Sequence, residues 1–148
     1  MAHDPDFAPP PGAFTHRFEV PASDVDDLGH ASNVSWVRWV GEAATAHSQA
    51  VGLDLAAYHE LGVYWVVRRH EIEYLGSAFG GEALDATTWV VDNRGASSRR
   101  RTLFRRAADG QVLGRATTTW ALVSAEGGKP ARIPRGLLER YGFEKGRP

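Results

Sequence analysis

The sequence predicts an α+β domain in which a curved antiparallel sheet of about five strands wraps around one long helix. Three observations favour this class. Residues 34–51 have the apolar spacing of an amphipathic helix, the second half of the chain contains strand-like segments, and the connections between those segments are short. Short connections join antiparallel strands, whereas parallel strands need long crossovers.

The first strand is predicted at residues 14–20, and the long helix follows it. Ser32 or Asn33 is a natural N-cap for this helix. A short second helix is expected within residues 52–61, closed by the glycine that follows. We expect the long helix to bury the face that carries its regularly spaced apolar residues: Val34, Val37, Val40, Ala44 and Val51.

Four further strands are predicted from segments rich in β-branched and aromatic residues, at 63–75, 82–92, 96–107 and 111–124. Glycine-containing turn sequences separate the strands, at 80–81, 93–95 and 109–110. Because such turns join neighbouring antiparallel strands, we expect the four strands to form a meander. A short helix at residues 135–141, with Pro134 in its first turn, ends the domain.

Length and composition predict a single domain at residues 13–142. The chain has 148 residues, of which 43% are hydrophobic and 24% charged. Residues 1–12 are rich in proline and are predicted to be a disordered tail, and residues 143–148 form a C-terminal tail. No apolar stretch approaches the roughly 20 residues of a membrane span, and no secretory signal is present, so we expect a cytoplasmic protein with no membrane partner.

Several classes of function are disfavoured by composition. The chain has no cysteine, which excludes disulfides, thiolate catalysis and cysteine-ligated zinc. Its net charge is −1, so nucleic acid is not an expected partner. No His-x-x-x-His pair supports a metal site. The aspartate-rich segment that begins at Asp24 does not fit a calcium loop, because Leu28 stands where an oxygen ligand is needed and Ser35 stands where a glutamate is needed.

The segment from Asp24 to Val34 is the most informative part of the chain. It ends a predicted strand, opens the long helix and gathers acid, base and amide side chains at the junction. The free N–H groups of a first helical turn favour an anion, or a carbonyl oxygen that becomes one. Catalysis at this junction is therefore plausible, although the aspartates could equally be solvated turn residues that favour the helix start through capping and its dipole.

This segment, with Trp36 and Trp39 after it, resembles the Asp-x-Asp-x-x-Gly-His-x-Asn-Asn pattern of hotdog-fold acyl thioesterases of the 4-hydroxybenzoyl-CoA thioesterase type. The resemblance continues through residues 66–75, 109–113, 119–123 and 130–134 and covers the chain from about Phe14 to Tyr141. One position departs from the pattern, because Ser32 replaces the first asparagine. The resemblance implies a hotdog fold and an acyl-CoA thioesterase activity.

It also implies roles for particular residues. Asp26 would act as general base or nucleophile, and the backbone N–H of Asn33 would stabilise the oxyanion. The side chains of His30 and Asn33 would orient water or the carbonyl, and Gly29 would let the backbone approach the substrate. Asp24 is more simply explained as a turn former. Coenzyme A would be part of the substrate, with acyl carrier protein as an alternative carrier, and no separate cofactor is expected.

The arginine cluster between residues 94 and 106 is the second candidate binding feature. Arg99 and Arg101 share one face of a strand and Arg100 lies on the other, so the cluster cannot form a single patch. The simple interpretation is a solvated outer face. By the resemblance, Ser98 and Arg99 would line the pantetheine and nucleotide channel, and further candidates for binding the phosphates are Arg132 and Arg135.

The large aromatic residues are expected mainly in the core. Trp36, close to the helix start, and Tyr58 or Trp65 could instead line an acyl pocket. The resemblance further implies a homodimer or homotetramer with the active site at a subunit interface. Two other functions stay open: a hotdog dehydratase or hydratase that acts on acyl thioesters, and a non-catalytic acyl-binding domain.

Overall fold

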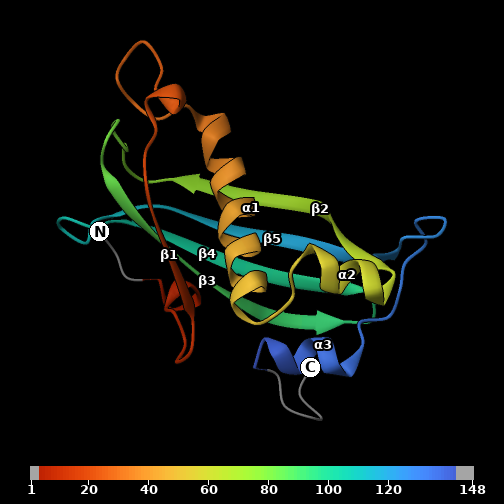
Figure 1. Cartoon of the computed structure of the whole chain (residues 1–148). Coiled ribbons are helices and arrows are strands. Elements are labelled where there is room, and N and C mark those ends of the chain that lie inside the picture. Colours follow the sequence, from red (N-terminus) through yellow and green to blue (C-terminus); the bar gives the residue numbers. More distant parts are fainter. Residues whose placement is uncertain (1–3, 143–148) are drawn as a thin grey trace.

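A computed structural model describes residues 4–142 of the chain (Figure 1). The helices and strands lie close to their predicted positions, so the α+β prediction is confirmed. The predicted tail at 143–148 lies outside the described residues. In chain order the elements are η1 Pro5–Phe7, β1 Phe14–Glu19, η2 Ala22–Asp24, α1 Asn33–Ala50, α2 Leu55–Leu61, β2 Val63–Tyr74, β3 Ala83–Arg94, β4 Ser97–Arg106, β5 Val112–Ser124 and α3 Arg135–Arg140.

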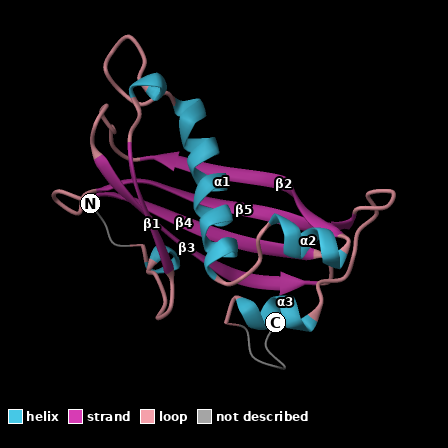
Figure 2. Ribbon diagram, in the orientation of Figure 1, coloured by secondary structure: helices cyan, strands magenta, loops and turns pink. Residues whose placement is uncertain are grey.

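The five strands form one antiparallel sheet in the order β1-β3-β4-β5-β2, and α1 lies across one face of it (Figure 2). The prediction of a four-strand meander is wrong for β2. Only β3, β4 and β5 form a meander, and β2 pairs with β5 at the far edge. The chain enters the sheet at one edge through β1, crosses its face as α1 and returns at the opposite edge as β2, which buries the helix against the central strands.

The predicted buried face of α1 is confirmed at Val40 and Ala44 but is wrong in the first turns of the helix. Val34 and Val37 are 72% and 41% exposed, whereas Trp36 and Trp39 are 3% and 1% exposed. The two tryptophans fill the concave side of the sheet together with Phe104 of β4, whose ring lies 5.2 Å from that of Trp36. The two tryptophans share the buried side of the helix with Val40, whereas Val34 and Val37 lie outside the core of the single chain.

Gly114 shows how tightly this core is packed. A Cβ atom at this position in β5 would lie 2.9 Å from the Trp36 ring and 3.2 Å from the carbonyl oxygen of Glu73. The missing side chain therefore makes room for the tryptophan beneath the sheet. A second core cluster, under α3, consists of Leu53, Leu122, Ile133 and Leu137.

Part of the predicted N-terminal tail is docked on the outer face of the sheet. Residues 5–7 form one 3-10 turn, and the ring of Phe7 lies 5.3 Å from the guanidinium of Arg101 and 5.0 Å from that of Arg115. Asp4 forms an ion pair with Arg115 at 2.9 Å. Composition alone did not indicate these cation–π contacts, which place one aromatic residue of the tail over two strand arginines.

Candidate functional site

The loop between β1 and α1 is a narrow antiparallel turn that extends beyond the end of the sheet (Figure 1). The N–H of Ser32 donates to the carbonyl of Asp24 at 2.8 Å, and the N–H of Asp26 donates to the carbonyl of His30 at 2.8 Å. Val25 and Ala31 form a β-bridge between these two bonds. The backbone thus fixes Asp26 about two residue steps along the ladder, or roughly 7 Å, from the level of Ser32, the residue that precedes the helix.

Asp26 is exposed in the single chain, and its carboxylate is held by its own loop. Its Oδ1 accepts the N–H of Leu28 at 2.9 Å and the N–H of His30 at 3.3 Å. Within residues 4–142, no donor is bonded to its other oxygen, Oδ2. The carboxylate is therefore oriented through one oxygen, and the other is available to a water molecule or a substrate.

Gly29 and His30 complete the turn. Gly29 has a φ of 82°, a left-handed conformation that a residue with a side chain would adopt only under strain. The Nδ1 atom of His30 lies 3.3 Å from the hydroxyl oxygen of Ser77, and its ring packs edge-on against Phe79. His30 is thus held by the loop that joins β2 to β3, and its backbone N–H donates to the Asp26 carboxylate.

Ser32 is the N-cap of α1, as the sequence predicted, although its side chain makes no capping hydrogen bond. In the described part of the chain, the N–H groups of Asn33 and Val34 donate to no acceptor, which is usual for a first helical turn. Asn33 is exposed, and its carbonyl accepts the hydroxyl of Tyr74 at 3.1 Å. The helix start is therefore joined to the edge strand β2.

Asp24 anchors the loop from beneath. It is 6% exposed and accepts the indole N–H of Trp39 at 3.1 Å as well as a hydrogen bond from Arg38. Burial alone would raise the pKa of Asp24, but these bonds and the charge of Arg38 hold it below its ordinary value. Asp24 is thus an ionised structural residue, in line with its interpretation as a turn former.

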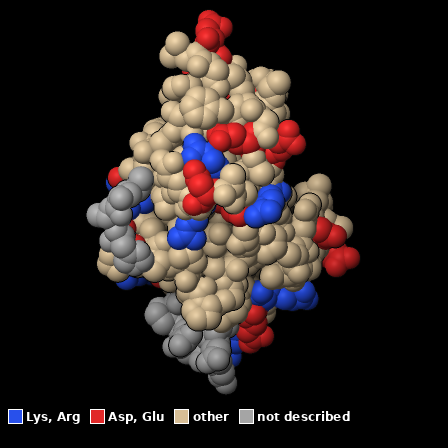
Figure 3. All heavy atoms as spheres, turned by 90° about the vertical axis from the view of Figure 1, so that its left-hand side faces the viewer, with Lys and Arg blue, Asp and Glu red and all other residues tan. Residues whose placement is uncertain are grey.

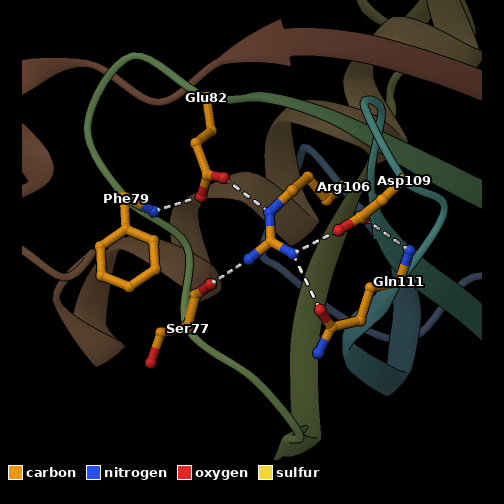
Figure 4. A network of polar contacts seen from close by, with 6 residues as sticks. All are labelled: Ser77, Phe79, Glu82, Arg106, Asp109 and Gln111. Carbon is orange, nitrogen blue, oxygen red and sulfur yellow. Dashed lines mark hydrogen bonds and ion pairs between the residues drawn. The ribbon is translucent and has the colours of Figure 1, made fainter.

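Arg106 fixes the β2–β3 loop that contacts His30 (Figure 4). Its Nε donates to Glu82 at 2.6 Å and its Nη2 to the carbonyl of Ser77 at 3.0 Å. Glu82 in turn accepts the N–H of Phe79 at 2.7 Å. The Nη1 atom of Arg106 donates to Asp109 and Gln111 in the β4–β5 turn. The arginine is largely buried, with 15% of its side chain exposed, so these charge-assisted bonds hold the loop in place.

A separate cavity of about 320 Å³ lies at the other end of α1, next to α2 and α3. Ser98, Tyr58 and Trp65 line it, as the resemblance and the aromatic pattern suggested for a substrate pocket. Sequence reasoning missed Arg100, which also lines this cavity and is only 5% exposed. Its position between the outward-facing Arg99 and Arg101 was the signal, because alternate residues of a strand point to opposite faces.

The other predicted binding residues lie apart from this cavity. Trp36 is 3% exposed and packs in the core on the concave side of the sheet, so its role as a pocket wall stays a prediction. Arg99 is on the outer face and pairs with Asp92. Arg132 and Arg135 are exposed near the β3–β4 turn, where the N–H of Ile133 donates to Gly95 at 3.0 Å. These arginines and Asp26 are thus at opposite ends of α1, whose 18 residues span about 27 Å.

None of the helices in residues 4–142 has the length and apolarity needed to cross a membrane. Acidic and basic side chains are interspersed on the face shown in Figure 3, so that face has no extended patch of one sign.

Comparison with known families identifies this arrangement. Residues 20–141 match the model of the thioesterase-like superfamily. The chain belongs to that superfamily. The match includes the 24–33 loop, all of α1 and strands β2 to β5.

Two proteins that are similar in sequence to this superfamily member are named as thioesterases. The chain is 21% identical over 135 residues to oleoyl-acyl carrier protein thioesterase 1 of Arabidopsis thaliana, covering 87% of this chain and 37% of the relative. It is 29% identical over 123 residues to the L-carnitine dehydrogenase/betainyl-CoA thioesterase of Rhizobium meliloti, covering 82% and 24%. The chain therefore spans about a third or less of the length of these two relatives.

Solved structures confirm the hotdog fold. A 1,4-dihydroxy-2-naphthoyl-CoA thioesterase from Synechocystis superposes with a TM-score of 0.80 at 19% identity, covering 88% of this superfamily member and 96% of that chain. An acyl-ACP thioesterase from Bacteroides thetaiotaomicron gives 0.78 at 24% identity, covering 92% and 55%. At these identities the likeness establishes the fold.

Proposed function

We propose that this protein hydrolyses acyl thioesters of coenzyme A or acyl carrier protein to a free acid and a thiol. The observation that carries the proposal is the Asp26 carboxylate, which is oriented through one oxygen on a loop that ends at the first turn of α1. The motif in this loop resembles that of the 4-hydroxybenzoyl-CoA type, and two named relatives act on thioesters of the two carriers.

Asp26 would act on the nucleophile. In the general-base route, its free oxygen takes a proton from water as the water oxygen attacks the carbonyl carbon. Collapse of the tetrahedral intermediate breaks the C–S bond, and the proton passes to the departing sulfur. In the alternative route the Asp26 carboxylate attacks the carbonyl carbon directly and expels the thiolate, and water then hydrolyses the mixed anhydride and supplies the proton that the thiolate takes up. Both routes give the same products and need the ionised carboxylate.

The first turn of α1 would stabilise the oxyanion. The N–H groups of Asn33 and Val34 are not used by the described chain, and the positive end of an 18-residue helix adds to their effect. A single oxyanion donor contributes about 3 kcal/mol to transition-state stabilisation in other enzymes. His30, fixed by Ser77 and Phe79, would orient the water next to Asp26.

A second copy of the chain would complete the site. In the part of the chain that the structure describes, the edge strand β2 has no neighbour on the side away from β5. Apolar residues are exposed beside it and on α1, including Val67, Tyr74, Val34 and Val37. The free edge of a strand of 12 residues is a ready surface for pairing. Two-fold antiparallel pairing of β2 with itself would place the Tyr74 end, next to the helix start, against the partner's Val63 end.

Such a pairing would also account for the large separation between Asp26 and the exposed arginines Arg132 and Arg135 in the single chain. The Val63 end of β2 lies by the cavity that Trp65 lines, and Arg132 and Arg135 lie at that end of α1. In one chain these arginines are far from Asp26, whereas in the proposed homodimer, or a tetramer built from it, they would approach the partner's site. A substrate with a phosphorylated carrier arm could then contact both copies.

A panel of thioesters tests the proposal. Acetyl-, hexanoyl-, benzoyl- and oleoyl-CoA, and the matching acyl carrier protein thioesters, are incubated with the protein, and free thiol is measured with a thiol-reactive dye. We expect steady thiol release from at least one member. Absence of release from every member would contradict the proposal and favour a non-catalytic acyl-binding domain.

A further inference from the structure

Arg100 is a buried cation without an anionic partner in residues 4–142. Its side chain projects from β4 toward α1 and is 5% exposed. Its Nη1 donates to Nδ1 of His47 at 2.9 Å and to the hydroxyl of Thr88 at 3.1 Å, which are both neutral acceptors. Its Nε and Nη2 make no hydrogen bond with the described chain. A buried charge normally has a charged partner, because the desolvation cost is otherwise several kcal/mol.

The groups around Arg100 do not neutralise it. Burial and the charge of Arg100 lower the pKa of His47 to about 4, so the imidazole is uncharged at neutral pH. The ring of Tyr141 lies 5.5 Å from the guanidinium, and burial raises the pKa of its hydroxyl, which stays protonated. Burial lowers the pKa of Arg100 itself, but an arginine stays protonated in proteins. Within residues 4–142, the positive charge of Arg100 therefore has no anionic partner.

This charge lies in the wall of the 320 Å³ cavity, which is the lower end of the size range for small-molecule sites. Most of the wall is apolar or aromatic and comes from α1, the α1–α2 loop, α2, β2 and α3: Ala44, Leu53, Tyr58, Trp65, Leu137 and Leu138. The wall also includes the exposed residues Asp54 and Leu55, so the cavity reaches the surface beside α2.

The polar part of the wall is rich in donors. The Nδ2 atom of Asn93 and the Nε1 atom of Trp120 are buried and have no acceptor in the described chain. The carboxylate in the wall, Asp54, caps α2 by accepting the N–H of Ala57 at 2.9 Å and forms no ion pair with Arg100. A ligand that supplies oxygen acceptors and one negative charge therefore fits these groups better than a cationic or a wholly apolar one.

We propose that this cavity binds a small organic carboxylate, with its apolar body against the aromatic wall and its carboxylate paired with Arg100. Two sources have this chemistry: a free carboxylic acid, or an acyl group whose far end carries a carboxylate while its other end is a thioester. Binding of a free acid does not depend on Asp26 or on hydrolysis, so the site can be tested apart from the proposed function.

The first test compares a carboxylate with its neutral amide. Benzoate and hexanoate, and then benzamide and hexanamide, are titrated into the full chain by calorimetry, with the fluorescence of Trp65 and Trp120 as a second readout. We expect at least one carboxylate to bind tenfold or more tightly than its amide. Equal affinity of each acid and amide, or no binding of either acid at millimolar concentration, would overturn the proposal without any variant.

Variants then assign the preference to Arg100. In Arg100→Met the preference for carboxylate is lost, while Arg105→Met, on the opposite face of the same strand, keeps it. Because Arg100 has no anionic partner in the described chain, we expect R100M to melt at or above the wild-type temperature, which separates lost binding from misfolding. A folded R100M protein that still prefers carboxylate would contradict the assignment.

The last experiment distinguishes a free carboxylic acid from an acyl group whose far end carries the carboxylate. Binding of glutaryl-CoA and of pentanoyl-CoA, which have the same chain length, is measured in the Asp26→Asn protein. Tighter binding of glutaryl-CoA, abolished by adding Arg100→Met, identifies the far end of an acyl group as the ligand. Equal binding of both thioesters, together with benzoate or hexanoate binding in the first test, identifies a free acid.

Discussion

Nε of Arg106 lies 2.6 Å from Oε2 of Glu82, and this pair links the end of β4 to the loop that holds His30. Both side chains are largely buried, and Glu82 uses its other oxygen to bind the N–H of Phe79. We predict that Arg106→Gln lowers the free energy of unfolding by about 2 kcal/mol, because it leaves the Glu82 carboxylate without its partner.

The same substitution should loosen the loop. Hydrogen exchange of the Phe79 and Ala31 amides, which depend on this loop, is expected to accelerate in R106Q. Arg105→Gln, one residue earlier on the other face, is the matched control and should leave exchange unchanged. Unchanged hydrogen exchange of these amides in R106Q would contradict the prediction and show that other contacts hold the β2–β3 loop.

Gly114 is expected to tolerate no side chain. Gly114→Ala places a methyl group 2.9 Å from the Trp36 ring, so we predict a loss of about 1–3 kcal/mol in unfolding free energy. At Gly41, inside α1, the same methyl position has no atom of residues 4–142 within 4 Å apart from the neighbouring residues and the backbone of the helix itself. Gly41→Ala should therefore stabilise the protein by up to about 1 kcal/mol through helix propensity. Chemical denaturation measures both changes, and equal effects would contradict the packing argument.

His47 predicts a pH dependence of stability. Its pKa is about 4 in the folded chain and near 6.5 when unfolded, so between these values the unfolded state binds more protons. The contribution of His47 to the free energy of unfolding is thus complete above pH 6.5 and is lost as the pH falls to 4. The shift corresponds to about 3 kcal/mol. We expect wild type to lose about that much more stability than His47→Gln from pH 6.5 to 4, measured by denaturation. Identical pH profiles would contradict a buried neutral His47.

The proposed homodimer predicts a change in mass on altering Val34. Wild type should sediment at twice or four times the chain mass of 16.2 kDa. Val34→Glu should dissociate it, because a charge would be buried in the interface, although a glutamate in the first helical turn favours the fold itself. Thr15→Glu, on the opposite sheet edge, should leave the mass unchanged. A wild type that sediments as one chain at micromolar concentration would contradict the proposal.

Local sequence signals predicted the elements well but not their long-range arrangement. Helix periodicity and glycine turns placed α1 and the five strands within a few residues. The pairing of β2 with β5 has no local signal, because it joins segments about 50 residues apart. Periodicity correctly predicted that Val40 is buried but failed at Val34 and Val37, which are exposed and which a second copy would cover in the proposed homodimer.

In the candidate site, too, local sequence predicted some features, whereas others depend on contacts between residues far apart in the chain. The 24–33 motif predicted a tight loop at the helix start, and the structure shows one. The Arg100–His47 contact joins residues 53 positions apart, and only the alternation of β4 indicated that Arg100 faces inward. The roles of Asp26, His30 and Asn33 in catalysis stay predictions, because they concern chemistry rather than position.

The most direct test of the account measures kcat/KM for the best thioester of the panel in wild type, Asp26→Asn and Asp27→Asn. Asparagine keeps the oxygen that binds the Leu28 and His30 amides, so the loop should survive in the first variant. Asp27 is an exposed neighbouring carboxylate and serves as the matched control. We predict that D26N loses at least about 100-fold in kcat/KM with unchanged unfolding, whereas D27N stays near wild type. Hydrolysis by folded D26N at the wild-type rate would contradict the central role of Asp26.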